Sequence, residues 1–182
     1  DAAMQNAVSV TSLKSNIMNS WLVEREIDAE EIARSEKLMS LIENARIGGT
    51  QNTGTTSAVT AITTELESFI GADHPNIQSI TLLDFKTKNI LAHLPASKKI
   101  DVANTDNLIA AASTKTQFMS RFDADRKYHE ISIAVPILEQ GGTLSAILFV
   151  ELETKTLAET LHDRTGLGAA GITYLIDKSG TL

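Results

Sequence analysis

The fold is decided by residues 118–153, which read FMSRFDADRKYHEISIAVPILEQGGTLSAILFVELE. Apolar residues stand at every second position from Ile131 to Ile137, and this alternation predicts a strand with one buried face. The turn that follows contains Gly141 and Gly142, which tolerate positive φ, so the chain is expected to fold back as a hairpin. Residues 146–150 are all apolar, as in a strand covered on both faces. We therefore expect three successive antiparallel strands here.

The rest of the chain predicts helices on either side of this stretch and one more hairpin. No proline or glycine interrupts residues 2–46, and apolar residues recur there at helical spacing. We expect one nearly continuous helix that packs Ile17 and Trp21 toward the sheet. Other expected elements are a helix at 55–70, strands at 77–85 and 89–94, a short helix over Leu108, Ile109 and Ala112, a helix at 154–164 and a strand at 172–177.

Composition limits the kinds of protein that this chain can be. Its 182 residues suffice for one well-buried domain, or for one domain and a fragment of another. The net charge of −7 disfavours a nucleic-acid surface, and the only basic cluster is Lys98 with Lys99. The absence of cysteine excludes disulfides and thiolate metal sites. No apolar run approaches the roughly 20 residues of a membrane span. We expect a globular domain without a nucleic-acid partner.

No group of residues in the sequence predicts catalysis or a bound cofactor. The four histidines stand far apart without the spacing of metal ligands, so no metal site is expected. No nucleophile motif such as Gly-x-Ser-x-Gly accompanies the acidic residues. We therefore expect no catalytic residue, no cofactor and no enzymatic activity.

The polar face of the central strand is the candidate binding surface. Tyr128, Glu130 and Ser132 alternate with apolar residues, so their face needs either water or a ligand. Arg121 has two open interpretations: its guanidinium group binds a ligand carboxylate, or it forms a surface ion pair with Asp123 or Glu130. Both signs of charge occur on this face, which favours a small polar solute over a lipid or a sugar polymer.

Several short motifs carry a resemblance to a known family. They are WLVER at 21–25, ISIAVPI at 131–137, AILFVEL at 146–152, and GLG at 166–168 followed by GITYLIDKSG at 171–180. Together with the predicted order of elements, they make the chain resemble Cache domains, which are PAS-like extracytoplasmic sensor domains. The double-Cache type occurs in transmembrane histidine kinases, chemoreceptors and cyclic-di-GMP enzymes.

The resemblance implies an α+β fold and a division of the chain. It implies a PAS-like five-stranded antiparallel sheet, with a long N-terminal helix packed on one face and a helical excursion over the other. Residues 1–54 would be the long helix and a loop, and 55–165 the membrane-distal module. Residues 166–182 would be a linker and the first strand of a truncated membrane-proximal module. We also expect the chain to be a segment excised from a longer protein.

The resemblance also implies a function and a site. A Cache module binds a small solute outside the cytoplasm and shifts the helices that lead to the membrane, which would anchor it through segments outside this sequence. Glu151 stands where amino-acid-binding members carry an acidic residue, although their Arg-x-Trp-Tyr signature is absent from 101–116. The alternative is a structural dimerisation or protein-binding segment of a membrane receptor with no small-molecule ligand. On either interpretation, the long helix is the candidate contact of a homodimer. The predicted ligand-binding residues are Arg121, Tyr128, Glu130, Ser132 and Glu151.

Overall fold

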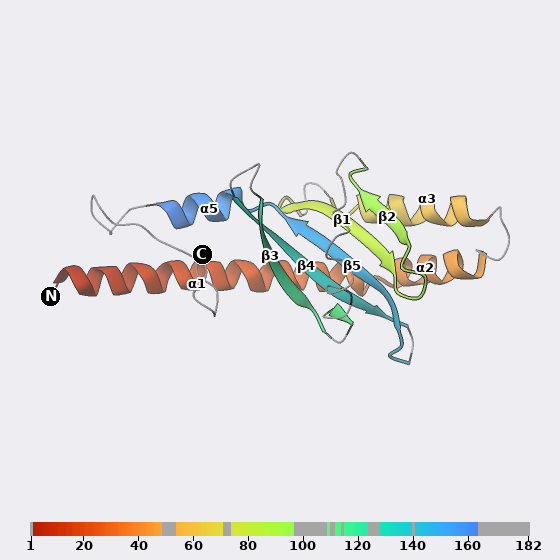
Figure 1. The fold of residues 1–182 in the computed structure, drawn as a ribbon, viewed down its shortest axis with the longest axis horizontal. Helices are drawn as coiled ribbons and strands as arrows, with labels where there is room; N and C mark the ends of the chain where they lie inside the picture. Colours follow the sequence, from red (N-terminus) through yellow and green to blue (C-terminus); the bar gives the residue numbers. More distant parts are fainter. Residues whose placement is uncertain are drawn as a thin grey trace. The chain divides into compact units, whose positions relative to one another are not determined.

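A computed structural model describes residues 2–48, 54–70, 74–96, 109, 112–113, 115–123, 128–139 and 141–163, with the backbone alone for residues 2–3, 48, 54–56, 119–123, 128–130 and 156. Figure 1 shows their helices and strands, which belong to two compact units. One unit contains residues 26–153, and the other contains 1–25 together with 154–182. The predicted linker at 166–171 and the predicted strand at 172–177 lie outside the described residues.

The described elements match the predicted order closely. Residues Ile109 and Ala112 of the predicted excursion are helical, and the other elements agree with the prediction to within a few residues, apart from the first helix. The elements are α1 (Ala2–Ala33), α2 (Glu36–Gly48), α3 (Gly54–Glu67), β1 (Ile77–Asp84), β2 (Ile90–Leu94), β3 (Gln117–Asp123), β4 (Tyr128–Leu138), β5 (Leu144–Leu152) and α5 (Lys155–His162).

The first helix is not continuous to residue 46, as the sequence had suggested. It ends at Ala33, and α2 begins at Glu36. The hydroxyl of Ser35 accepts a hydrogen bond from the Leu38 N–H at 3.2 Å, which makes Ser35 the N-cap of α2. Glu36 in the first turn of α2 adds a favourable interaction with the helix dipole. A serine cap therefore interrupts the helix without proline or glycine.

The unit of residues 26–153 is built on a five-stranded antiparallel sheet in the order β2-β1-β5-β4-β3. The β4–β5 turn uses Gly141 and Gly142 at φ values of 107° and 82°, as predicted. One sheet face and the helices beside it form the main core (Figure 1). Its fully buried side chains include Ile32, Leu38, Ile42, Ile62, Leu66, Ile80, Leu82, Ile133, Ile137, Leu148 and Val150.

A smaller apolar cluster covers part of the opposite sheet face. Ile109 and Ala112 pack there against Leu83, Ala134 and Ile147. The Ser113 N–H donates to the Ile109 carbonyl oxygen at 3.0 Å and closes one helical turn. We call Ile109, Ala112 and Ser113 the covering turn. This arrangement confirms the prediction that a helical excursion lies over the face away from the helices.

The second unit contains the N-terminal part of α1 and α5. Lys14, although nearly buried, donates from Nζ to the Leu161 carbonyl oxygen at 2.7 Å and also to the Asp163 carbonyl oxygen. These carbonyl groups end α5, where no further turn of helix supplies donors. Lys14 therefore caps α5 from α1.

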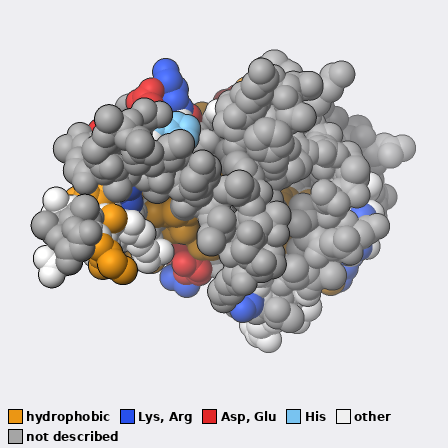
Figure 2. Space-filling view, turned by 60° about the vertical axis from the view of Figure 1, so that its left-hand side comes forward, with side chains coloured by type: hydrophobic (Ala, Val, Ile, Leu, Met, Phe, Trp, Pro, Cys, Tyr) orange, Lys and Arg blue, Asp and Glu red, His pale blue; other side chains and the backbone are white. Residues whose placement is uncertain are grey.

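The N-terminal part of α1 exposes apolar side chains. Figure 2, in which the side bearing the N-terminus comes forward, shows hydrophobic groups at the surface. Ile17 is 38% exposed, so the prediction that it packs inward is wrong, whereas Trp21 is half-buried, with the Arg25 guanidinium carbon 6.0 Å from its ring centroid. The other large apolar side chains that are exposed in this part are those of Met4, Val8, Leu13 and Val23.

Candidate ligand-binding site

The sheet register places all five predicted positions on one face. Arg121 pairs with Glu130 across β3 and β4, and Ser132 pairs with Glu151 across β4 and β5. Directly paired residues of antiparallel strands share a face, and so do residues two apart, which adds Tyr128. This is the face opposite the helices, since Ile133 and Val150 occupy the helix side. The backbone thus brings together residues from three strands.

Glu151 lies on β5, between serine residues of the two neighbouring strands. Ser79 on β1 and Ser132 on β4 are its direct neighbours in the two flanking strands. The Ser79 hydroxyl donates a hydrogen bond to Glu151 Oε2, and Ser79 is only 1% exposed, whereas Glu151 is half-buried. A buried hydroxyl therefore orients one carboxylate oxygen. An ionised carboxylate held in this way accepts hydrogen bonds and attracts a cationic group.

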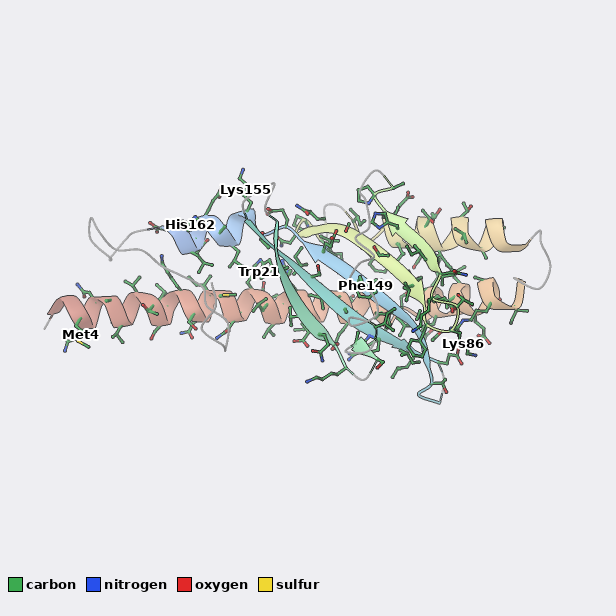
Figure 3. All side chains as sticks on the ribbon, viewed as in Figure 1. Met4, Trp21, Lys86, Phe149, Lys155 and His162 are labelled. Carbon is green, nitrogen blue, oxygen red and sulfur yellow. The ribbon has the colours of Figure 1, made fainter. Side chains whose placement is uncertain are left out.

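Three further residues on this face were missed by sequence reasoning. Thr81 Oγ1 lies 2.8 Å from His93 Nδ1, and both side chains are half-buried. Phe149, labelled in Figure 3, is paired with Thr81 on one side and with Ala134 on the other. The alternation of Ser79 and Thr81 with Ile80 and Leu82 was the available signal. It did not show that β1, besides pairing with β2, also pairs with the distant strand β5.

The face divides into an apolar end and a polar end, with Phe149 between them. The covering turn packs against the apolar end, which is formed by Leu83, Ala134 and Ile147. The polar end begins at Thr81 and Phe149 and carries Ser79, Ser132 and Glu151. Concave sites for small molecules combine apolar walls with a few placed polar groups. This face supplies both kinds of surface side by side.

The sheet register gives the spacing of two charged positions, Arg121 and Glu151. Arg121 and Glu151 stand two strands apart and two residues apart along the strands, which separates their Cα atoms by roughly 12 Å. An acidic group near Arg121 and an amino group near Glu151 would be compatible with this spacing.

Metal binding finds no support in the described part of the chain. Among those residues, no group of three or more histidine, aspartate or glutamate side chains is placed to hold an ion. The described helices also include none with the length and apolar character needed to span a membrane.

No protein-family model and no curated protein matches this sequence. Solved structures do match its fold. The ligand-binding domain of the Campylobacter jejuni chemoreceptor Tlp3, solved with 4-methylisoleucine, is 13% identical with a TM-score of 0.63, over 98% of this chain and 68% of that one. The sensor domain of the V. cholerae histidine kinase DctB is 9% identical with a TM-score of 0.62, over 90% and 60%.

A third similar structure is the ligand-binding domain of the Pseudomonas aeruginosa amino-acid chemoreceptor PctC, solved in complex with GABA. It is 16% identical with a TM-score of 0.58, over 90% of this chain and 66% of that one. This chain therefore spans about two thirds of the length of the chemoreceptor domains and less of the kinase domain. These likenesses confirm the predicted fold, a five-stranded antiparallel sheet with a long N-terminal helix, and the domains that share it are ligand-binding domains of chemoreceptors and the sensor domain of a histidine kinase.

Proposed function

We propose that this chain is the ligand-sensing domain of a transmembrane receptor, either a histidine kinase or a chemoreceptor. A small polar solute would bind on the sheet face opposite the helices, at Arg121, Tyr128, Glu130, Ser132 and Glu151. The observation that carries the proposal is the placement of Glu151, a half-buried carboxylate oriented by the buried Ser79 hydroxyl on that face. The shared fold of chemoreceptor and kinase sensor domains supports it.

Amino compounds are the first ligand class that we propose. GABA and 4-methylisoleucine, the ligands named for two of the similar domains, each carry an amino group and a carboxylate. The charges on the proposed face complement such a molecule, because Glu151 suits the ammonium group and Arg121 suits the carboxylate. Ser79 adds preorganisation, since the acceptor is already oriented before the ligand arrives.

A thermal-shift screen of the purified domain tests this proposal. The panel contains the L-amino acids, GABA, small amines without a carboxylate and small carboxylates without an amine. A true ligand at a hundredfold excess over its Kd should stabilise the domain by about 2.7 kcal/mol and raise the Tm accordingly. Stabilisation by one class and not by the others identifies the group that is recognised. A panel without any stabilising compound would contradict the proposal.

The proposal extends to location and assembly. We place the domain outside the cytoplasm, anchored by membrane segments outside residues 1–182, as in the family that it resembles. Within it, residues 55–165 would be the membrane-distal module that carries the site. Fusion of the full-length receptor to a reporter that is active only outside the cytoplasm tests the location. Activity on the cytoplasmic side would contradict it.

The exposed apolar side chains of α1 favour a second candidate function, a structural dimerisation segment without a small-molecule ligand. Met4, Val8 and Leu13 are all largely exposed in the described N-terminal part of the helix. Sedimentation of the wild-type domain and of a Leu13→Asp variant tests this reading. A dimer that the variant converts to a monomer, together with a negative ligand screen, would favour it over sensing.

A further inference from the structure

Glu30 near the end of α1 uses its two carboxylate oxygens for two different partners. Oε1 accepts a hydrogen bond from the Thr116 hydroxyl at 2.9 Å, and Oε2 lies 2.7 Å from Nη2 of Arg34. The Glu30 side chain is 28% exposed, whereas that of Arg34 is 77% exposed. The contact with Thr116 is therefore the more protected of the two, and it joins residues far apart in the sequence.

Thr116 lies between the covering turn and strand β3 of the sheet. It directly precedes β3, the edge strand that carries position 121 of the proposed site. Ser113, the last residue of the covering turn, lies three residues before Thr116. Ala112 of the same turn is completely buried at the apolar end of the face. A displacement of Thr116 would therefore involve both the covering turn and the start of β3.

Glu30 lies close to the break between α1 and α2. The helix ends three residues later, at Ala33, and Ser35 then caps α2. A cleft of about 510 Å³ opens beside this break. Its walls are formed by Ile27, Glu30, Glu31, Arg34, Ser35 and Phe69. On its other side the break packs on the main core through Ile32 and Leu38. The Glu30 contact therefore meets α1 where one side of the chain borders a cleft and the other is fixed in the core.

We infer that Glu30 is a positioning residue for the proposed site. Through Thr116 it holds the covering turn and the start of β3, and it links their position to the break between α1 and α2. One consequence of this inference rests on the proposed ligand-sensing function. It is that a ligand bound at the site changes the conformation at the break between α1 and α2. The physical link itself is a property of the free protein. Coupling of this kind requires that both ends respond to the same change.

Hydrogen exchange on the free domain tests the link without any ligand. Thr116→Val removes the hydroxyl donor and keeps the shape, whereas Thr116→Ser keeps the donor. Glu31→Gln is the charge control, because Glu31 lines the same cleft without contacting Thr116 in the described structure. Thr116→Val should raise exchange by roughly fivefold or more in both 27–37 and 117–123. The two control variants and the β5 amides should keep wild-type exchange.

Two outcomes would overturn the inference. A rise confined to the residues around Thr116, with 27–37 unchanged, would show that α1 does not respond. A rise that includes the β5 amides would show general destabilisation, which a positioning role does not predict. Either result is independent of whether the domain binds a solute.

A ligand measurement separates this inference from the proposed function. For each compound of the panel that raises the Tm, Thr116→Val should weaken affinity by roughly threefold or more, and Thr116→Ser should restore it. Unchanged affinity in Thr116→Val would overturn the positioning role while leaving ligand sensing intact. If no compound raises the Tm, the proposed function fails and the exchange experiment alone decides whether Glu30 and Thr116 couple the two segments.

Discussion

Nε of Arg46 lies 2.7 Å from Oδ2 of Asp84 and joins α2 to the first hairpin. The same guanidinium group contacts the Glu139 carboxylate, and its Nη2 donates to the Ser145 carbonyl oxygen at 2.5 Å. Glu139 and Ser145 flank the turn between β4 and β5. One arginine therefore ties a helix to the turn regions of both hairpins, on the sheet face opposite the proposed site.

Asp84→Asn should lower the free energy of unfolding by about 2–3 kcal/mol. The Asp84 carboxylate is almost fully buried, and it also accepts a hydrogen bond from the Thr87 N–H at 2.7 Å. The neutral amide weakens both interactions and leaves Arg46 without its buried counter-charge. Denaturant titration measures the loss. Glu139→Gln is the matched control. The Glu139 side chain is 44% exposed, so the loss of its charge should lower the free energy of unfolding by under about 1 kcal/mol. Equal losses would contradict this account.

The same pair predicts how stability depends on pH. Burial acts to raise the Asp84 pKa, but the Thr87 N–H and Arg46 outweigh it, so this pKa lies below its ordinary value of 3.8. A lowered native pKa contributes stability that is fully present above pH 3.8 and is lost as the pH falls through the native value. The stability difference between wild type and Asp84→Asn should therefore be constant from pH 7 to about pH 5 and shrink below pH 3.8. A difference that persists unchanged at pH 2.5 would contradict it.

Lys14→Met should loosen α5 without unfolding the sheet. The lysine donates to the carbonyl groups of Leu161 and Asp163, and methionine keeps the apolar stem but not the donors. Amide exchange in α5 should rise by roughly tenfold or more, while exchange in β4 and β5 stays unchanged. Lys155→Met, at the exposed start of the same helix, is the control. Unchanged α5 exchange in Lys14→Met would show that the cap contributes little.

Glu151→Gln should abolish most ligand binding while leaving the fold intact. The substitution keeps the size of the side chain and an oxygen for the Ser79 hydroxyl, but it removes the charge that an ammonium group requires. Affinity for any amino compound found in the screen should fall by roughly tenfold or more in calorimetry, with the Tm of the free domain little changed. Glu159→Gln in α5 is the charge control. Unchanged affinity in both Glu151→Gln and Arg121→Ala would move the site off this face.

The strands were predictable from sequence because their signals are local. Alternation around Ile133 identified β4, and paired glycines at 141 and 142 identified its turn. The break after Ala33 was not predictable in the same way, because Ser35 acts through one hydrogen bond to Leu38 and is compatible with a helix interior. Propensity along the chain does not reveal which serine becomes a cap.

The candidate site was only partly predictable, for a different reason. Glu151 and Ser132 were identified, but their neighbour Ser79 was not, because it reaches them only when β1 pairs with β5. Pairing between strands distant in sequence depends on the whole fold, and the sequence of neither strand identifies its partner. His93 depends on the same pairing, since it joins this face through Thr81.

The central position of β5 has a consequence for how the chain folds. β5 is the last strand of the described sheet, yet it lies between β1 and β4, and its Leu152 pairs with Ile77. The first hairpin therefore cannot join the other strands until β5 has been synthesised and has left the ribosome. Loop closure over so long a segment slows folding, and until then β1 presents an unpaired edge. Nascent chains that stop before Leu144 should accordingly depend on chaperones.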